Sequence, residues 1–142
     1  MYIDATVIKG RTKPFTCSIQ TTDGLQNQDP SEPTHDNLVW NPYNLSGNNI
    51  RFRVMGSPTA DAKVLVEHII SDTTDEETEG QITDVEGGQF TFVITAEDTL
   101  KLGLGNHPIM IDIIDAESGR LVFGLTEGGR NGEFSKIQVV QV

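Results

Sequence analysis

The chain has 142 residues and a mass of 15.6 kDa, enough for one domain with a single core and too little for two domains of ordinary size. Its 21 acidic and 10 basic residues give a formal charge of −11, and a surface of this sign repels nucleic acid. The sequence contains no apolar run near the ~20 residues that a membrane helix needs. We therefore expect no nucleic-acid partner and no membrane partner.

The first residues of the chain and its single cysteine together predict a protein that is made and kept in a reducing compartment. Met1-Tyr2-Ile3-Asp4 has no basic region ahead of an apolar stretch, so we expect no signal peptide. The one cysteine, Cys17, has no partner for an internal disulfide. Because Cys17 alternates with Phe15 and Ile19, we expect it to face the core as a small apolar group rather than to act as a nucleophile.

Alternation of apolar and polar residues, the pattern of half-buried β-strands, dominates the sequence. Glycine-containing turns separate the alternating segments, and their spacing predicts a sandwich of about eight or nine strands. Two segments are apolar on both faces over part of their length, which favours central or covered strands: Lys63–Ser71 and Pro108–Asp115. The remaining strand segments centre on Ile3–Val7, Phe15–Ile19, Ile50–Val54, Phe90–Ile94, Leu121–Leu125 and Phe134–Val142.

Two other segments complete the predicted organisation. One short helix is expected near residues 96–101, because Thr95 can cap it and Asp98 follows three residues later, in capping-box order. Residues 21–44 lack alternation and contain three prolines around one apolar group, Leu38-Val39-Trp40. A loop of this length is usually functional, so we expect a long loop or docking arm.

Negative charge is concentrated in the middle of the chain. Residues 64–100 contain ten acids and no lysine or arginine. The densest part, residues 72–80 with Asp75, Glu76, Glu77 and Glu79, predicts an acidic hairpin tip in solvent. Clustered oxygens can bind calcium, but the spacing does not match a dedicated calcium loop. A contact with a basic patch on a partner is the third alternative.

The remaining candidate residues point to binding rather than to catalysis. Trp40 and Tyr43 flank Pro42, and they fit three roles: folding back over the core, anchoring a protein interface, or stacking on sugar rings. The histidines are far apart in sequence and predict surface or edge positions rather than a metal site: His35, His68 and His107. No paired carboxylates and no Ser/His/Asp constellation stand out, so we expect no enzyme, cofactor or metal.

The order of short motifs along the chain resembles a known architecture. Tyr43-Asn44-Leu45-Ser46-Gly47 leads into the strand Asn49–Met55, and the strand from Gly88 to Thr95 runs into Ala96-Glu97-Asp98-Thr99. Gly105–Ile113 follows, and Gly132-Glu133-Phe134 opens the last strand. Over roughly residues 43–142 this pattern resembles the immunoglobulin-like β-sandwich of tailed-phage virion proteins, notably the N-terminal domain of the phage baseplate upper protein family.

The resemblance implies an all-β fold, a single immunoglobulin-like antiparallel β-sandwich over residues 1–142, and a non-enzymatic structural role in the tail, baseplate or neck of a phage particle. The expected location is the virion, assembled in the host cytoplasm, and the expected partners are other phage structural proteins in a symmetric or multi-copy assembly. A capsid decoration protein and a carbohydrate-binding or adhesin-like module are the alternatives. The expected partner interface consists of Leu38, Val39, Trp40, Tyr43, Asp75, Glu76, Glu77 and Glu79.

Overall fold

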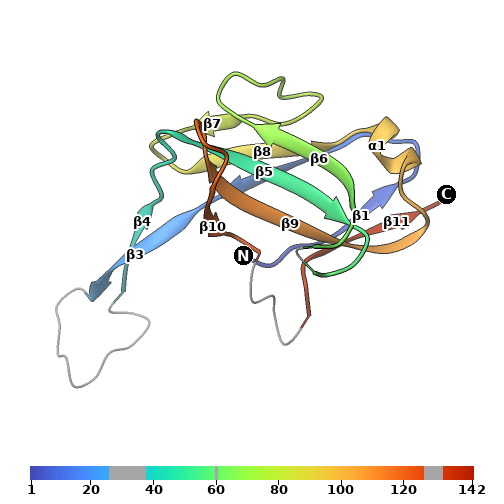
Figure 1. Cartoon of the computed structure of the whole chain (residues 1–142), viewed down its shortest axis with the longest axis horizontal. Helices are drawn as coiled ribbons and strands as arrows, with labels where there is room; N and C mark the ends of the chain where they lie inside the picture. Colours follow the sequence, from blue (N-terminus) through green and yellow to red (C-terminus); the bar gives the residue numbers. More distant parts are fainter. Residues whose placement is uncertain (26–37, 60, 127–132) are drawn as a thin grey trace.

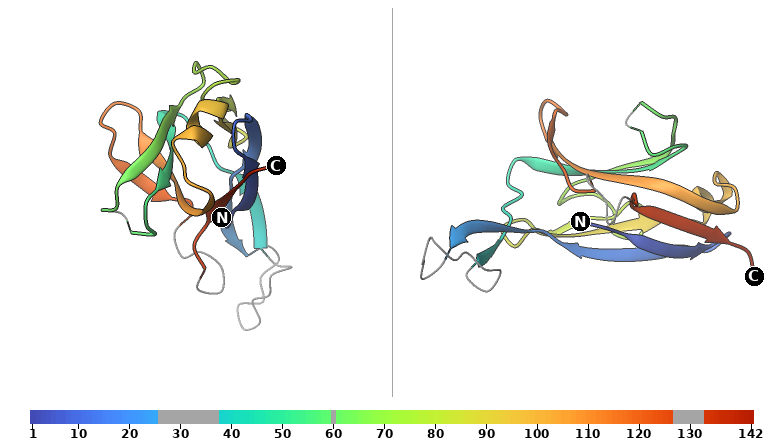
Figure 2. Two further views of the ribbon diagram at one scale, coloured as in Figure 1. Left: turned by 90° about the vertical axis from the view of Figure 1, so that its right-hand side faces the viewer. Right: turned by 90° about the horizontal axis from the view of Figure 1, so that it is seen from below.

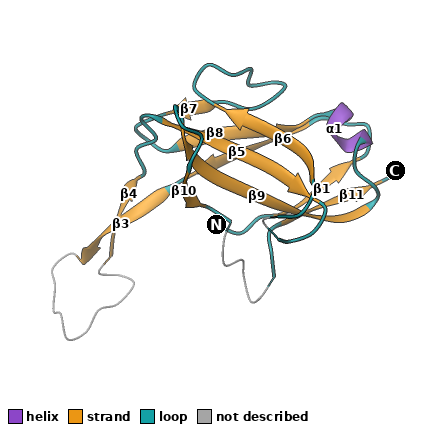
Figure 3. Ribbon diagram, in the orientation of Figure 1, coloured by secondary structure: helices purple, strands orange, loops and turns teal. Residues whose placement is uncertain are grey.

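The computed structural model describes residues 1–25, 38–59, 61–126 and 133–142 (Figure 1). In these residues every regular element is a strand except one short helix (Figure 3). The elements in chain order are β1 (Asp4–Ile8), β2 (Lys13–Ser18), β3 (Gln20–Leu25), β4 (Leu38–Pro42), β5 (Asn48–Met55), β6 (Val64–Ile70), β7 (Ile82–Asp84), β8 (Gln89–Ile94), α1 (Ala96–Leu100), β9 (Gly105–Asp115), β10 (Leu121–Gly124) and β11 (Lys136–Val140).

The strands form two facing layers (Figure 2). The larger sheet has the order β1-β11-β9-β5-β6, and β10 pairs with β9 beyond the point where β11 stops. The smaller sheet has the order β2-β8-β7. All of these pairs are antiparallel except β1 with β11, which run parallel.

This strand order is that of the immunoglobulin fold. In that fold, strands C, F and G form one sheet and strands A, B, E and D form the other, with the letters following chain order. Here β9 lies between β11 and β5, β6 extends that sheet as in variable-type domains, and β2, β8 and β7 form the opposite layer. The prediction of an all-β, immunoglobulin-like sandwich with one short helix is therefore confirmed.

The core lies between the two layers and is centred on stacked aromatic rings. Phe52 of β5 stacks on Phe92 of β8 with ring centroids 4.7 Å apart, so this pair joins the layers. Phe15 of β2 stacks on Phe92 at the same distance of 4.7 Å. Cys17 is half-buried against this core, as the alternation predicted. Burial of such large apolar side chains is the main favourable contribution to folding.

The two segments predicted to be buried on both faces behave differently. In β9, four successive residues from Ile111 to Ile114 are buried, as expected for a central strand. β6 lies at the edge of its sheet, where Val64 is 38% and Ile69 is 39% exposed, so the prediction for Lys63–Ser71 is wrong. The outer face of β6 has no further layer against it in the described part of the chain, and exposed Glu67 lies on it between Leu65 and Ile69.

The ends of residues 21–44 pair with each other instead of forming an open loop. β3 and β4 form an antiparallel hairpin that leaves one end of the sandwich, and they raise the strand count to eleven in the described residues (Figure 1). β-Branched threonines in β3 and the apolar group in β4 suit strand geometry, which explains the pairing. The rest of the predicted arm, residues 26–37, lies outside the described residues.

The acidic segment 72–80 is a connection between layers and not the tip of a hairpin. It follows β6, which belongs to the larger sheet, and precedes β7, which belongs to the smaller one. The C-terminal segment is paired inside the sheet, with β11 between β1 and β9. This pairing covers a segment that is short of charge and would be prone to aggregate if its edges were left open.

The predicted capping box at α1 is present. Asp98 donates its backbone N–H to Thr95 Oγ1, and Thr95 donates its backbone N–H to Asp98 Oδ2, both at 3.0 Å. Asp98 Oδ2 also lies 2.8 Å from His68 Nε2, which links β6 to the helix. Burial acts to raise the pKa of Asp98, but the hydrogen bonds from His68 and Thr95 outweigh it and lower that pKa below its ordinary value.

An Asp98→Asn variant is expected to lose about 1–2 kcal/mol of unfolding free energy at pH 7, because asparagine keeps the shape but not the charge that these donors stabilise. Because the pKa of Asp98 is lower in the native state than in the unfolded chain, its ionised carboxylate stabilises the fold at pH values above the unfolded pKa of about 4. This stabilisation is lost as the pH falls through the native pKa. Urea denaturation at pH 7 and pH 3 should therefore show a larger difference between wild type and variant at pH 7. An equal difference at both pH values would contradict this account.

Candidate functional site

The most exposed apolar segment of a strand in the described residues is β10. Leu121 is 54%, Val122 is 47% and Phe123 is 59% exposed. The alternation of Leu121, Phe123 and Leu125 predicted that these three share one buried face, and of them only Leu125 is buried. A register shift between Leu121 and Phe123 interrupts the pairing with β9, so alternation does not continue along β10. Exposed apolar residues gathered on one strand are typical of an interaction surface.

The turn before β10 fixes the position of this strand. Asp115 Oδ1 accepts hydrogen bonds from the backbone N–H groups of Glu117 and Ser118, both at 2.9 Å. Gly119 adopts φ 71°, a conformation that glycine allows without steric cost. The chain then returns along β9, and within the described residues β9 is the only strand that pairs with β10.

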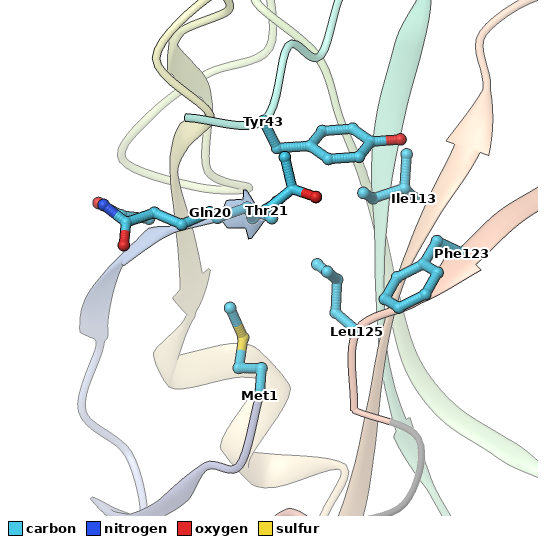
Figure 4. A pocket seen from close by; sticks show the side chains of 9 residues that line it. Met1, Gln20, Thr21, Tyr43, Ile113, Phe123 and Leu125 are labelled. Carbon is cyan, nitrogen blue, oxygen red and sulfur yellow. The ribbon is translucent and has the colours of Figure 1, made fainter. Parts of the chain in front are cut away.

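An open, largely apolar pocket of about 620 Å³ lies beside β10, where β2 passes into β3 (Figure 4). Phe123 and Leu125 lie on one side of it with Ile113 of β9, and Met1 lies across from them. Tyr43, which follows β4, closes another side. The pocket therefore joins a residue predicted for the interface, Tyr43, to the exposed strand β10.

The backbone around Tyr43 is held in place by close packing against the turn between β7 and β8. Tyr43 donates its N–H to the Ile19 carbonyl at 3.0 Å, and Ile19 donates its N–H to the Gly88 carbonyl at 2.9 Å. A Cβ atom on Gly88 would lie 2.7 Å from the carbonyl oxygens of both Ile19 and Tyr43, so only glycine fits there. This crossing sets the point at which the β3–β4 hairpin leaves the sandwich.

Trp40 and Tyr43 differ in what they contact. Tyr43 is half-buried and packs against the core, whereas Trp40 lies in β4 and is 47% exposed. Of the three roles open to these residues, folding back over the core therefore applies to Tyr43 and not to Trp40. Leu38 and Val39 lie in the same strand, opposite β3.

The four acidic residues of the predicted interface lie on a separate surface. Asp75, Glu76 and Glu77 are exposed and Glu79 is half-buried. The turn is well braced, because the Asp75 carbonyl accepts the backbone N–H groups of Glu79 and Gly80 at 3.0 Å. Glu77 and Glu79 line a shallow depression with the first residues of α1, and it shares no lining residue with the pocket at Tyr43.

The remaining candidates have structural partners. His107 Nε2 lies 2.6 Å from the Gly103 carbonyl oxygen, His68 contacts Asp98, and His35 lies outside the described residues. Over the described ranges, no group of His, Cys, Asp and Glu side chains is arranged to hold a metal ion. Burial raises the pKa of the Cys17 thiol to about 11, so this side chain is a protonated thiol at neutral pH. None of the helical structure in the described residues is long and apolar enough to span a bilayer.

Comparisons with known proteins identify similar folds but no family. No family model matches the chain, and no curated protein does. Among solved structures, the NK cell receptor Nkp44, a triggering partner in natural cytotoxicity, is similar over 100% of this chain and 99% of its own, with 12% identity and a TM-score of 0.47. The ZIG-8 IG1 homodimer is similar over 99% of this chain and 81% of its own, with 10% identity and a TM-score of 0.37. Similarity at this level carries no argument about function.

Proposed function

We propose that this chain is a non-enzymatic structural subunit of a tailed-phage particle, in the tail, baseplate or neck, and that it holds neighbouring subunits through exposed side chains of β10 and β4. The observation that carries the proposal is the exposed apolar run Leu121-Val122-Phe123 on a strand that pairs on one side only, within the described residues. The resemblance of the motifs in residues 43–142 to phage baseplate upper proteins supports the choice of particle.

An uncovered strand edge with exposed apolar side chains favours pairing with another chain. An edge strand presents backbone N–H and C=O groups that can template pairing with another chain, and apolar side chains increase that tendency. Natural proteins protect strand edges with charged residues, with proline or with a covering segment. Residues 121–124 contain no charged residue and no proline. A partner that adds a strand to β10 would satisfy the edge and cover the apolar residues.

Trp40→Ala and Phe123→Ala are each expected to weaken binding to the particle by about tenfold or more, since buried aromatic anchors dominate interface energies. Each should lower the free energy of unfolding by no more than about 1 kcal/mol, because both side chains are about half exposed. Co-sedimentation with particles measures the first quantity and urea denaturation the second.

Val64→Ala is the matched control, because Val64 is an exposed apolar residue on a strand far from this surface in the sheet order. It should leave particle binding unchanged. If Trp40→Ala unfolds the domain, or if both variants bind particles as wild type does, the proposed interface is wrong.

A carbohydrate-binding module is the second candidate, favoured by one observation, the 47% exposure of Trp40. An exposed indole can stack on the apolar face of a sugar ring. A glycan array probed with and without calcium separates the two functions: specific binding that Trp40→Ala abolishes would favour the sugar-binding module over the structural subunit.

A further inference from the structure

The edge of β10 differs from the other edges of the two sandwich sheets. Charged residues and prolines protect most exposed strand edges from pairing with another chain. Lys13 lies over β1, because its Nζ donates a hydrogen bond to the Thr6 carbonyl oxygen at 2.9 Å. β2 contains Pro14, β6 contains exposed Glu67, and β7 ends at exposed Asp84. Among the edges of these sheets in the described residues, only β10 contains neither a charged residue nor a proline.

The larger sheet is one strand narrower at β10 than at β11. β10 and β11 follow one another along the same edge of β9, where β10 pairs with residues 112–114 and β11 with residues 105–108. β1 covers the outer edge of β11, in a pairing that begins at Asp4. In the same row, no described strand covers the outer edge of β10. An added segment of about five residues, at ~3.3 Å each, would cover this edge along Leu121–Leu125.

The pocket beside β10 lies on the inner face of this open row. Ile113 and Leu125 form one side of it, and Ile19 and Tyr43 form another (Figure 4). None of the residues that line the pocket has a charged side chain. Successive residues of a strand point to opposite faces of a sheet, so every second residue of a segment added to β10 would point toward the pocket.

The lining of the pocket selects an uncharged side chain. A charged group there would lose its contact with water, and no lining side chain offers an opposite charge. An apolar side chain would instead remove the exposed ring of Phe123 and the half-buried ring of Tyr43 from water. The volume of about 620 Å³ lies within the range of pockets that bind compact apolar groups, and it is large enough for an aromatic ring.

We infer that β10 accepts an extended segment of another protein, which adds a strand to the open edge and places an uncharged apolar side chain in the pocket beside Tyr43. The inference rests on the proposed function, because it gives the chemistry of the partner segment that contacts β10. In recognition by strand addition, backbone hydrogen bonds supply affinity and side-chain pockets supply specificity. The partner segment is therefore defined by its extended backbone and by one apolar residue, and not by its charge.

The test titrates the isolated chain with blocked five-residue peptides and follows its backbone amide resonances by NMR. The peptide acetyl-Thr-Val-Phe-Val-Thr-amide should shift the resonances of residues 121–125 and bind with a Kd of about 1 mM or below. The same peptide with aspartate in place of phenylalanine should bind at least ~10-fold more weakly, because its charge finds no partner in the pocket. Proline in place of both valines should weaken binding by a similar factor, because it removes backbone donors.

Thr21→Trp tests the pocket itself. Thr21 is exposed and lines the pocket, so an indole at this position fills it and should weaken binding of the phenylalanine peptide at least ~10-fold. Thr83→Trp is the matched control, because Thr83 is exposed on β7 in the other sheet and lies outside the pocket. This variant should bind the peptide as wild type does.

Three results would overturn the inference. The first is the absence of shifts in residues 121–125 at about 10 mM peptide, tenfold above the expected Kd. The second is equal binding of the aspartate and phenylalanine peptides. The third is a shift of the same resonances with protein concentration alone, which would assign the edge to a second copy of the chain.

Binding to particles separates this inference from the proposed function. The peptide titration uses the isolated chain, so its result does not depend on the identity of the particle. Particle binding that Thr21→Trp leaves unchanged would refute only the strand addition at β10. Peptide binding by a chain that no particle contains would refute only the proposed function.

Discussion

Replacing Asp112 with alanine is expected to lower the free energy of unfolding by about 3–5 kcal/mol. Asp112 lies on β9 and is 2% exposed. Its Oδ2 accepts hydrogen bonds from Arg51 Nη2 at 2.9 Å and from Arg53 Nη2 at 2.7 Å. Both arginines lie on β5, two residues apart and therefore on the same face of the sheet, and one carboxylate serves both.

The size of this effect follows from the burial of the two guanidinium groups. The side chains of Arg51 and Arg53 are 24% and 12% exposed, and their Nε atoms are buried without a hydrogen-bond partner among the described residues. Without Asp112, two neighbouring cations lose the group that compensates them, and they repel each other.

Urea denaturation measures this loss, and Glu117→Ala serves as the exposed acidic control, with an expected change below about 0.5 kcal/mol. A triple variant with Arg51→Met, Arg53→Met and Asp112→Leu should recover most of the lost stability, because it removes the charges together. If Asp112→Ala unfolds at the same urea concentration as the control, the buried charge cluster does not have the role described.

Replacing Gly80 with alanine is expected to cost about 3 kcal/mol or more, through steric overlap and backbone strain combined. Gly80 adopts φ 113°, which side chains with a Cβ rarely adopt. An added Cβ atom would overlap the Thr91 carbonyl oxygen and lie 2.7 Å from Phe92 Cα. These backbone atoms cannot move aside, because Thr91 exchanges backbone hydrogen bonds with Gln81, the residue after Gly80.

Gly47 provides the control that separates strain from overlap. It adopts φ 75°, and nothing lies within 4 Å of an added Cβ atom. Gly47→Ala should therefore cost only about 1 kcal/mol, the strain of a left-handed residue. Thermal or urea denaturation of the two variants measures the difference, and equal losses would show that the close approach at Gly80 is relieved without cost.

The sequence by itself determined the kind of element at most positions. Period-2 alternation placed the strands of the sandwich, since residues that alternate must present one face to a core. The capping pair Thr95 and Asp98 located the helix, because both hydrogen bonds depend only on residues three apart. Alternation around Cys17 likewise predicted the face of β2 on which it lies.

Only the tertiary structure decided which strands are neighbours, because alternation reports the buried face of a strand and not its partner. It placed β6 at an edge and β7 in the other layer, and this made residues 72–80 a connection between sheets. It brought Tyr43 to Phe123 and left the acidic residues near α1 on another surface. Contacts between residues this far apart in sequence depend on the packing of the whole chain, and no local pattern encodes them.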